Sequence, residues 1–381
     1  MSSNHRQPRK RTRGLALAAV SAGALAIAVA ASSSVASGAA NWSTATSAAT
    51  GGGFSALVKA AKAEGTLNLI ADPFNWANYG EIISSFSQKY GIKVNDVNKL
   101  GTSQQEITAL QTLGSQSRAP DAVDVGQSYA LANTSLFAPY EVQSWKLIPA
   151  ANKDPQGRWA NDYGGYVSIG CNTSIVKVCP TSFADLTNPA YKNDVALDNS
   201  PVTANSAFSA VWAAALANGG SFSNIAPGIA FFQKLHQEGN FVETPGLPGA
   251  ISSGQTPIVI DWDYNNAAAA VANAGKFKWT TAVPTDASFA AFYAQAISAK
   301  APHPAAARLW LEYLYSATGQ NLWLKGLSRP VELPAMIKNG TVNKTDLKAL
   351  PAVSTAAKYP TEAQVTAAEA VVAAQWASSQ S

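Results

Sequence analysis

Hydrophobic patterning alternates between helix and strand periods along most of the chain, and this alternation constrains the fold more than any other feature. Residues 54–64 (FSALVKAAKAE) carry apolar residues at helical spacing, and residues 66–71 (TLNLIA) have the pattern of a buried strand. Helices at 79–90 and 103–113 then alternate with strands at 92–97 and 122–125. Strands that alternate with helices predict an α/β protein with a parallel sheet and helices on both faces.

A second alternating series follows an irregular stretch, residues 139–165. Its predicted helices are 182–186, 204–218, 227–238 and 266–274, and its predicted strands are 166–171, 195–197, 257–260, 277–283 and 292–297. Helices at 304–315, 318–325 and 362–376 complete the chain.

The two series predict two α/β lobes. Lobe 1 is expected from residues 54–164 and 298–381, and lobe 2 from residues 165–297. Two crossover strands, near Gly164-Gly165 and Tyr293–Ser298, would form a hinge between the lobes. We expect the last two helices to return and cover lobe 1.

The N-terminus has the pattern of an export signal. Five basic residues in the first 13 positions precede an uncharged stretch, 14–31, and small residues follow it. This order predicts a secretory signal peptide over residues 1–40, with an uncleaved membrane anchor as the alternative. Residues 41–53 are polar and Gly-rich, which predicts a flexible leader.

The two cysteines agree with export. Cys171 and Cys179 are eight residues apart, and in an oxidising compartment such a pair usually forms a disulfide. Two buried free thiols are the alternative. A zinc site is not expected, because the chain has no further cysteine and only His236 and His303 follow the signal.

The charge balance does not favour nucleic acid as a partner. The formal net charge is +4, but without the five N-terminal basic residues the chain has 22 basic and 23 acidic residues. No basic run or charged stripe remains. We therefore expect no nucleic-acid binding. A metal or other cofactor is not expected either, because the chain has no zinc-ligand set, no P-loop motif and no dinucleotide fingerprint.

Loops after the predicted strands are the candidate ligand-binding segments, because ligands of open α/β sheets bind beyond the carboxyl ends of strands. Tyrosines near the predicted crossovers add to them. The candidates are Asp72, Asn75, Trp76, Thr102, Ser103, Gln127, Ser128, Tyr163, Tyr166, Asn205, Ser206, Trp262, Asp263, Tyr264 and Tyr293.

The segment Asp261–Tyr264 stands out among these loops, since two carboxylates flank Trp262 directly after a buried strand. Carboxylates and aromatic faces are the groups that hold a desolvated ammonium, and Asp72 and Trp76 would face them. The alternatives are structural: Trp76 and Trp262 cap the core, and Asp72 forms a turn before Pro73. Thr102, Ser103, Asn205 and Ser206 would suit an anion at helix N-termini, or they are helix N-caps, with Ser103 and Glu106 forming a capping box.

One enzyme motif is present in part. Gly126–Ala130 (GQSYA) resembles the G-x-S-x-G nucleophile elbow, with Ser128 as nucleophile and Asp263 and His303 later in the chain. No HGGG-type oxyanion segment accompanies it, and His303 lies between two prolines at a predicted helix start. A secreted α/β-hydrolase is therefore the alternative function from another class.

Several longer stretches resemble a known family. They include LVKAAKAEGTLNLIA, YGEIISSFSQKYGIKV, APDAVDVG, TSFADLTNPAYKNDVAL, GQTPIVIDWDYNN and AARLWLEYLYSATGQNLWLKG. Together they are similar to the extracellular solute-binding proteins of bacterial ABC importers, in the branch that contains polyamine, ferric-iron and thiamine binders. The resemblance covers nearly all of the chain after the signal.

The resemblance implies a two-lobed, type II periplasmic-binding-protein fold and no enzymatic activity. The protein would act as a monomer in the periplasm or at the cell surface and deliver a small solute to a membrane permease. Carried over by position, Trp262 and Asp263 suit a polyamine-like cation. An anion such as a phosphonate or phosphorylated compound, or ferric ion, remains open.

Overall fold

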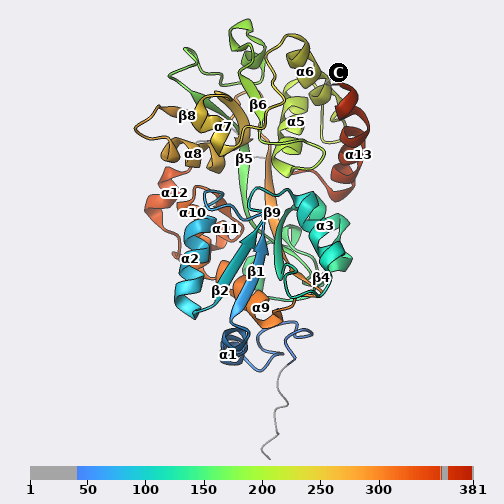
Figure 1. Cartoon of the computed structure of the whole chain (residues 1–381), viewed down its shortest axis with the longest axis vertical. Helices are drawn as coiled ribbons and strands as arrows, with labels where there is room; N and C mark the ends of the chain where they lie inside the picture. Colours follow the sequence, from blue (N-terminus) through green and yellow to red (C-terminus); the bar gives the residue numbers. More distant parts are fainter. Residues whose placement is uncertain (1–40, 352, 354–358, 380–381) are drawn as a thin grey trace, which may run out of the picture. The chain divides into compact units, whose positions relative to one another are not determined.

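The computed structural model describes residues 41–351, 353 and 359–379 (Figure 1). The predicted signal peptide, residues 1–40, lies outside the described residues. Residues 40–381 group into one compact unit, and all contacts below lie within it.

Helices occupy most of the segments that the apolar periodicity predicts. They are α1 (Phe54–Glu64), α2 (Tyr79–Tyr90), α3 (Ser103–Leu113), α4 (Gln127–Ala132), α5 (Asn205–Ala217), α6 (Ala226–Gln237), α7 (Pro248–Ser253), α8 (Asp263–Ala272), α9 (Pro304–Leu314), α10 (Ala317–Lys325), α11 (Leu333–Asn339), α12 (Lys344–Ala349) and α13 (Glu362–Ser379). Glycines follow several of them. Gly65 and Gly91 end α1 and α2 in the left-handed conformation, which costs glycine nothing.

The strands form a small sheet and a large one. They are β1 (Thr66–Ile70), β2 (Lys93–Val97), β3 (Ala122–Gly126), β4 (Phe137–Ala138), β5 (Ala160–Asn172), β6 (Val195–Leu197), β7 (Ile258–Trp262), β8 (Trp279–Ala282), β9 (Ala290–Ser298) and β10 (Arg329–Pro330). β1 pairs with β2, and the remaining strands form an eight-stranded sheet with the main order β3-β9-β5-β7-β6 among the described residues.

The expectation of a parallel sheet holds for only part of the molecule. β1 is parallel to β2 and β6 is parallel to β7, whereas the pairs β3–β9, β5–β9 and β5–β7 are antiparallel. The reason is that each antiparallel pair contains β5 or β9, the two long strands, which run opposite to the strands beside them. The result is a mixed sheet.

The long strand β5 exchanges partners along its length. Its first part pairs with β9 and β10, and its second part, from Val167 to Asn172, pairs with β7 and β8 (Figure 1). All of its residues are buried. β5 therefore belongs to both halves of the sheet, as the predicted crossover near Gly164-Gly165 requires, although the lobe boundaries themselves stay a prediction.

The C-terminal helix differs from expectation. α10 contacts α2 and α9, but α13 lies against α6 and α4 and does not only cover the first lobe (Figure 1). Its Trp376 is buried, with its ring 5.7 Å from that of Phe232 in α6. The apolar face of α13 is thus satisfied largely by the segment predicted as lobe 2.

Residues 41–53 also differ from the flexible leader that their composition predicts. Trp42 is buried, and the buried guanidinium of Arg308 donates from Nε to the carbonyl oxygen of Ala45 at 2.8 Å. Glu141 N donates to Thr46 O at 2.7 Å. A buried arginine needs acceptors, and this segment supplies them from its backbone.

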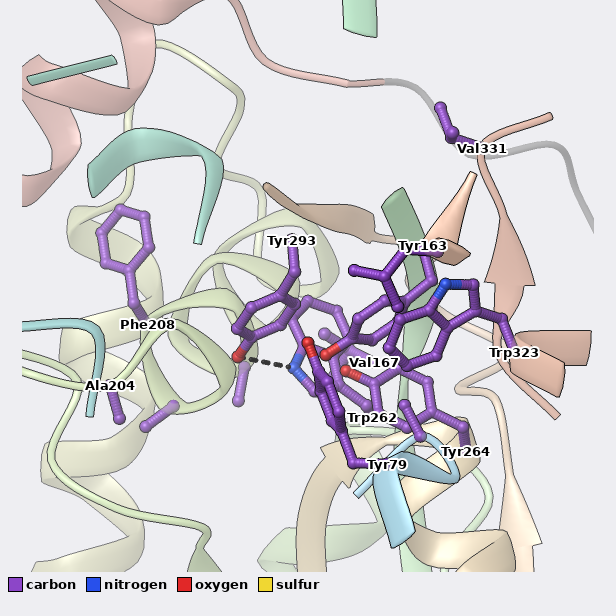
Figure 2. Close-up of a cluster of buried hydrophobic side chains, with 14 of the residues drawn as sticks. Tyr79, Tyr163, Val167, Ala204, Phe208, Trp262, Tyr264, Tyr293, Trp323 and Val331 are labelled. Carbon is purple, nitrogen blue, oxygen red and sulfur yellow. Dashed lines mark hydrogen bonds between the residues drawn. The ribbon is translucent and has the colours of Figure 1, made fainter. Parts of the chain in front are cut away.

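The core between the two halves of the sheet is aromatic (Figure 2). Tyr163 stacks on Trp323 with ring centroids 4.3 Å apart and on Tyr293 at 5.7 Å, and Tyr79 meets Trp323 edge-on at 4.9 Å. Trp262 Nε1 donates to Tyr293 Oη at 3.4 Å. These rings pack against one another in a single cluster.

The disulfide prediction is confirmed: Cys171, near the end of β5, is bonded to Cys179, with the two Cα atoms 5.9 Å apart. The bond closes the loop that follows β5. This loop lies at the end of β5 that does not pair with β10.

Candidate functional site

A cavity opens where the strand ends of both series meet helix N-termini. Its empty volume is about 970 Å³, with open solvent at its mouth included. The wall comes from the segment after β1, the start of α3, the end of β3, the segment after β6, the start of α5, the end of β7, α7 and α8. The cavity thus lies where open α/β sheets bind their ligands.

Four carboxylates line this cavity. Glu106 comes from α3 and Asp124 from β3, while Asp198 follows β6 and Asp261 belongs to β7. All four residues are buried, with 2% to 8% of their surface exposed. Two therefore come from the segment predicted as lobe 1 and two from the segment predicted as lobe 2.

Asp124 is held by a hydrogen-bonded chain. Trp76 Nε1 donates to Tyr163 Oη at 2.7 Å, and Tyr163 Oη donates to Asp124 Oδ2 at 2.7 Å. The backbone N–H of Asp124 donates to Glu106 Oε2 at 3.0 Å. Oδ1 of Asp124 makes no hydrogen bond within the part of the chain that the structure describes. These hydrogen bonds fix the orientation of the carboxylate, and the hydroxyl of Tyr79 also lies near it.

The opposite pair of carboxylates is also oriented. Ser206 Oγ donates to Asp198 Oδ2 at 2.6 Å, and the backbone N–H of Trp262 donates to Asp261 Oδ1 at 2.6 Å. Burial raises the pKa of Asp261 well above its ordinary value, and the nearby charge of Asp198 raises it further.

Burial governs the titration of the other two carboxylates as well. It raises the pKa of Asp124 to about 7, although the hydrogen bond from Tyr163 lowers it. It also raises the pKa of Glu106 well above its ordinary value, and the neighbouring charges of Asp72 and Asp124 add to this effect. A positive charge placed among these groups would stabilise their ionised forms, since opposite charges lower a carboxyl pKa.

The backbone at Gly126 packs closely against Asn205, which lines the cavity. A Cβ atom at Gly126, the last residue of β3, would lie 2.5 Å from Asn205 Cγ at the start of α5. Ser103 Oγ accepts a hydrogen bond from Gly126 N at 3.0 Å. Glycine is therefore required where β3, α3 and α5 meet at the cavity.

The predicted site residues divide into two groups. Those that line the cavity are Asn75, Trp76, Thr102, Ser103, Asn205, Ser206 and Tyr293. The remaining eight do not line it: Asp72, Gln127, Ser128, Tyr163, Tyr166, Trp262, Asp263 and Tyr264.

Several residues of the second group support the wall from behind. Tyr163, Trp262 and Tyr264 belong to the aromatic core (Figure 2), and Asp72 is buried beside Asp124 and Asp96. Gln127 and Ser128 line a second, smaller cavity, which Asn205 separates from the first by contributing to both.

Asp263 is engaged elsewhere. Its Oδ2 is paired with Arg329 Nη1 at 2.5 Å, and its Oδ1 accepts from the backbone N–H groups of Tyr166 and Tyr264 at 3.0 and 3.1 Å. The guanidinium of Arg329 also lies over the ring of Tyr166, 4.7 Å from its centroid. This carboxylate therefore connects β10, β5 and α8.

Asp263 does not line the cavity because β7 ends later in the chain than the sequence pattern predicts. The strand continues through Asp261 and Trp262, which the sequence pattern placed in a loop, and α8 begins at Asp263, three residues earlier than expected. Successive residues of a strand point to opposite faces. Asp261 accordingly lines the cavity, while Trp262 stacks in the core.

The capping box of α3 is shifted by one residue in the same way. Thr102 is the N-cap and Gln105 Oε1 accepts from Thr102 N at 3.0 Å, in place of the predicted Ser103 and Glu106. Ser103 and Glu106 are turned inward and line the cavity instead.

Sequence reasoning missed Glu106, Asp124 and Asp198 as cavity residues. Each had a signal. Asp124 interrupts an otherwise apolar buried strand, Asp198 directly follows the strand Val195–Leu197, and Glu106 lies in the first turn of a helix at a strand end. A carboxylate in a buried strand calls for a partner, which makes it a candidate for ligand binding.

The hydrolase alternative lacks the geometry of a triad. His303 Nδ1 lies 2.9 Å from Asp121 Oδ2, and Asp263 is paired with Arg329, so the histidine does not pair with the acid that the motif predicts. Ser128 belongs to α4 and faces the smaller cavity. The structure therefore does not support the acyl-transfer constellation.

Within the described ranges, no helix combines the length and apolar character needed to cross a bilayer. In the same part of the chain, no group of three or more His, Cys, Asp or Glu side chains is placed to hold a metal ion.

Solved structures with similar folds include periplasmic binding proteins. The chain resembles AfuA from Actinobacillus pleuropneumoniae, solved with fructose-6-phosphate, at a TM-score of 0.64 and 18% identity over 83% of this chain and 98% of that one. It resembles a ferric binding protein from Campylobacter jejuni at 0.59 and 17%, over 82% and 99%. A GABA receptor matches at 0.59 and 18%, over 83% and 97%.

The mixed α/β fold is that of the two-lobed, type II periplasmic binding proteins, as predicted. The family model described as bacterial extracellular solute-binding protein matches residues 124–353, more than half of the chain. The chain belongs to this family, which consists of binding proteins and serves ABC importers.

Proposed function

We propose that this protein captures a small cationic solute that carries at least one ammonium group and delivers it to an ABC permease. One observation carries the choice of a cation: four buried carboxylates line the cavity, namely Glu106, Asp124, Asp198 and Asp261. Buried carboxylates are unfavourable unless they are paired, and an ammonium group supplies the pairing.

Aromatic rings near these carboxylates support the same proposal. Trp76 and Tyr293 line the cavity, with their ring centroids 5.6 Å apart and their planes nearly perpendicular. The face of an indole or phenol ring attracts a cation, by about 2 kcal/mol or more where the cation is desolvated. Trp76 is held by its hydrogen bond to Tyr163, so the ring is preorganised for binding.

Hinge closure is the mechanism we propose. A cation that touches Asp124 on one side and Asp261 on the other gains both contacts only when the two predicted lobes are close together. Such differential contacts shift the population toward the closed form. A micromolar affinity requires about 8 kcal/mol, which a few charge-assisted hydrogen bonds and ring contacts supply. The permease would then recognise the closed, monomeric protein outside the membrane.

The anion alternative has one feature in its favour. The starts of α3 and α5 line the cavity through Ser103 and Ser206, and helix N-termini favour negative charge. The effect of each helix end is roughly half an elementary charge. When they are ionised, the four carboxylates beside the helix ends carry more negative charge than the helix ends supply positive charge. A cation is therefore the better supported ligand.

A thermal-shift panel tests the proposal. Putrescine, spermidine, methylphosphonate, inorganic phosphate and ferric citrate are each added to the purified protein at pH 8. We expect an amine to raise the melting temperature and the anions and ferric citrate to leave it unchanged, because a ligand that binds only the folded state stabilises it. Stabilisation by an anion or by iron, without any effect of amines, would contradict the proposal.

A further inference from the structure

The lining of the cavity changes character between its floor and its mouth. At the floor, Glu106, Asp124, Asp198 and Asp261 are almost fully buried. The lining residues that reach the surface include polar side chains, among them Asn75, Lys99 and Ser252, and a group of apolar ones. Leu100 is 56% exposed, and Leu247, Pro248, Ala269 and Ala272 are half-buried or exposed.

The apolar residues at the mouth come from the segments predicted as lobe 1 and as lobe 2. Leu100 precedes α3, whereas Leu247 and Pro248 lie at the start of α7, and Ala269 and Ala272 belong to the last turns of α8. An occupant that extends outward from the floor therefore meets hydrocarbon surface from both predicted lobes. Burial of such surface stabilises a bound apolar group by about 25 cal/mol per Å².

One positive charge stands at the same mouth. Lys99 is exposed and is the one lysine or arginine among the described residues that line the cavity. Its ammonium lies 5.9 Å from the centroid of the exposed Phe74 ring. A second ammonium group of a bound solute would meet this charge and the apolar side chains, and both contacts disfavour it.

The floor is a built site and more than a group of acids. Asp124 Oδ1 and Asn205 Nδ2 both lack a hydrogen-bond partner among the described residues, and both residues line the cavity while being at least nine-tenths buried. An acceptor and a donor without partners at this depth point to a polar group of a ligand. An ammonium group satisfies the acceptor, which the chain from Trp76 through Tyr163 holds in place.

We infer that the solute is an amphipathic monoamine, whose single ammonium group binds at the acidic floor and whose alkyl or aryl body fills the apolar mouth. This inference rests on the proposed function, since it assumes a cation, and it narrows the class of that cation. It differs from a linear polyamine, which carries charge along its whole length.

Three probes of equal chain length separate the possibilities. Hexylamine, hexamethylenediamine and aminocaproate share one ammonium end and differ only at the other, which is a methyl group, an ammonium or a carboxylate. Calorimetric titration at pH 8 should give hexylamine an affinity about tenfold higher than that of hexamethylenediamine, because the second charge loses apolar contact and meets Lys99.

The other outcomes overturn the inference in distinct ways. An equal or tighter affinity for hexamethylenediamine would favour a polyamine, and a tighter affinity for aminocaproate would assign Lys99 as the partner of a carboxylate. In both cases the proposed cation function stands. If none of the three amines binds while methylphosphonate does, the proposed function fails together with the inference.

Variants at the mouth test the assigned contacts. Leu100→Ser should weaken hexylamine about fivefold and leave hexamethylenediamine nearly unchanged, since it removes only an apolar contact. Val271→Ser is the matched control, because Val271 is 76% exposed and does not line the cavity. Lys99→Gln should reduce the difference in affinity between hexylamine and hexamethylenediamine. An unchanged ratio of affinities in both Leu100→Ser and Lys99→Gln would remove the mouth from the binding site.

Discussion

Replacing Asp124 by asparagine should affect stability and binding in opposite directions. Asp124 is 5% exposed, and burial raises its pKa from 3.8 to about 7. At 1.36 kcal/mol per pKa unit, ionising it in the folded protein costs about 4 kcal/mol. Asparagine carries no charge and still accepts the hydrogen bond from Tyr163. At pH 8, Asp124→Asn should therefore raise the unfolding free energy of the solute-free protein by on the order of 2 kcal/mol, less than the full cost because its amide also needs partners.

Binding should weaken in the same variant. A hydrogen bond between an ammonium and a carboxylate contributes about 1.5–3 kcal/mol, so its loss corresponds to about a 10-fold to 150-fold lower affinity. The assay pairs urea unfolding with calorimetric titration of whichever amine stabilises the wild-type protein most, both at pH 8.

A matched control separates a cavity residue from a merely buried one. Asp162 is fully buried, and burial raises its pKa well above its ordinary value, but it does not line the cavity. Asp162→Asn should leave the amine affinity undiminished. The reasoning is refuted if Asp124→Asn destabilises the solute-free protein at pH 8 and binds the amine as tightly as the wild type does.

Three further predictions follow from the same geometry. Asp263→Asn should lower the unfolding free energy by about 3 kcal/mol in urea titrations, because it leaves the guanidinium of Arg329 without its partner, and a wild-type value would contradict this role. Gly126→Ala should weaken amine binding by at least about tenfold in calorimetry, because the new Cβ would displace Asn205 from the end of β3. An unchanged affinity would show that Asn205 can move aside without loss of the binding site. The melting temperature of the solute-free protein should fall as the pH rises from about 4 to about 7. The reason is that Asp124 keeps its proton in the folded protein over this range, whereas it loses the proton in the unfolded chain. Saturation with an amine should abolish this fall in melting temperature.

Much of the local structure could be predicted from the sequence. The predicted helix Ser103–Leu113 and strand Val195–Leu197 agree with the observed elements, because apolar spacing and glycine stops act locally. The loop rule also directed attention to Trp76, Asn205 and Ser206, all of which line the cavity. These successes depend on the strand-end position of ligand sites, which topology imposes on any open α/β sheet.

Element boundaries were the weak point, and at the site a shift of one or two residues changes a side chain's role. β7 ends at Trp262 and not at residue 260, so Asp261 faces the cavity and Asp263 starts a helix. The N-cap of α3 is Thr102 and not Ser103, which turns Glu106 inward. Such boundaries depend on hydrogen bonds from other parts of the chain, which a local pattern does not contain.

The sequence indicated an α/β protein with acidic and aromatic residues at its strand ends, and it favoured a disulfide between Cys171 and Cys179 that the structure confirms. These properties follow from periodicity, compartment and composition, all of which can be read along the chain. Only the tertiary structure decided which acids share a cavity. Asp124 and Asp261 are far apart in sequence, and Asp263 is paired with Arg329, 66 residues away. Pairing between distant charges is decided by packing of the whole fold, because each buried carboxylate takes the partner that the surrounding elements bring to it.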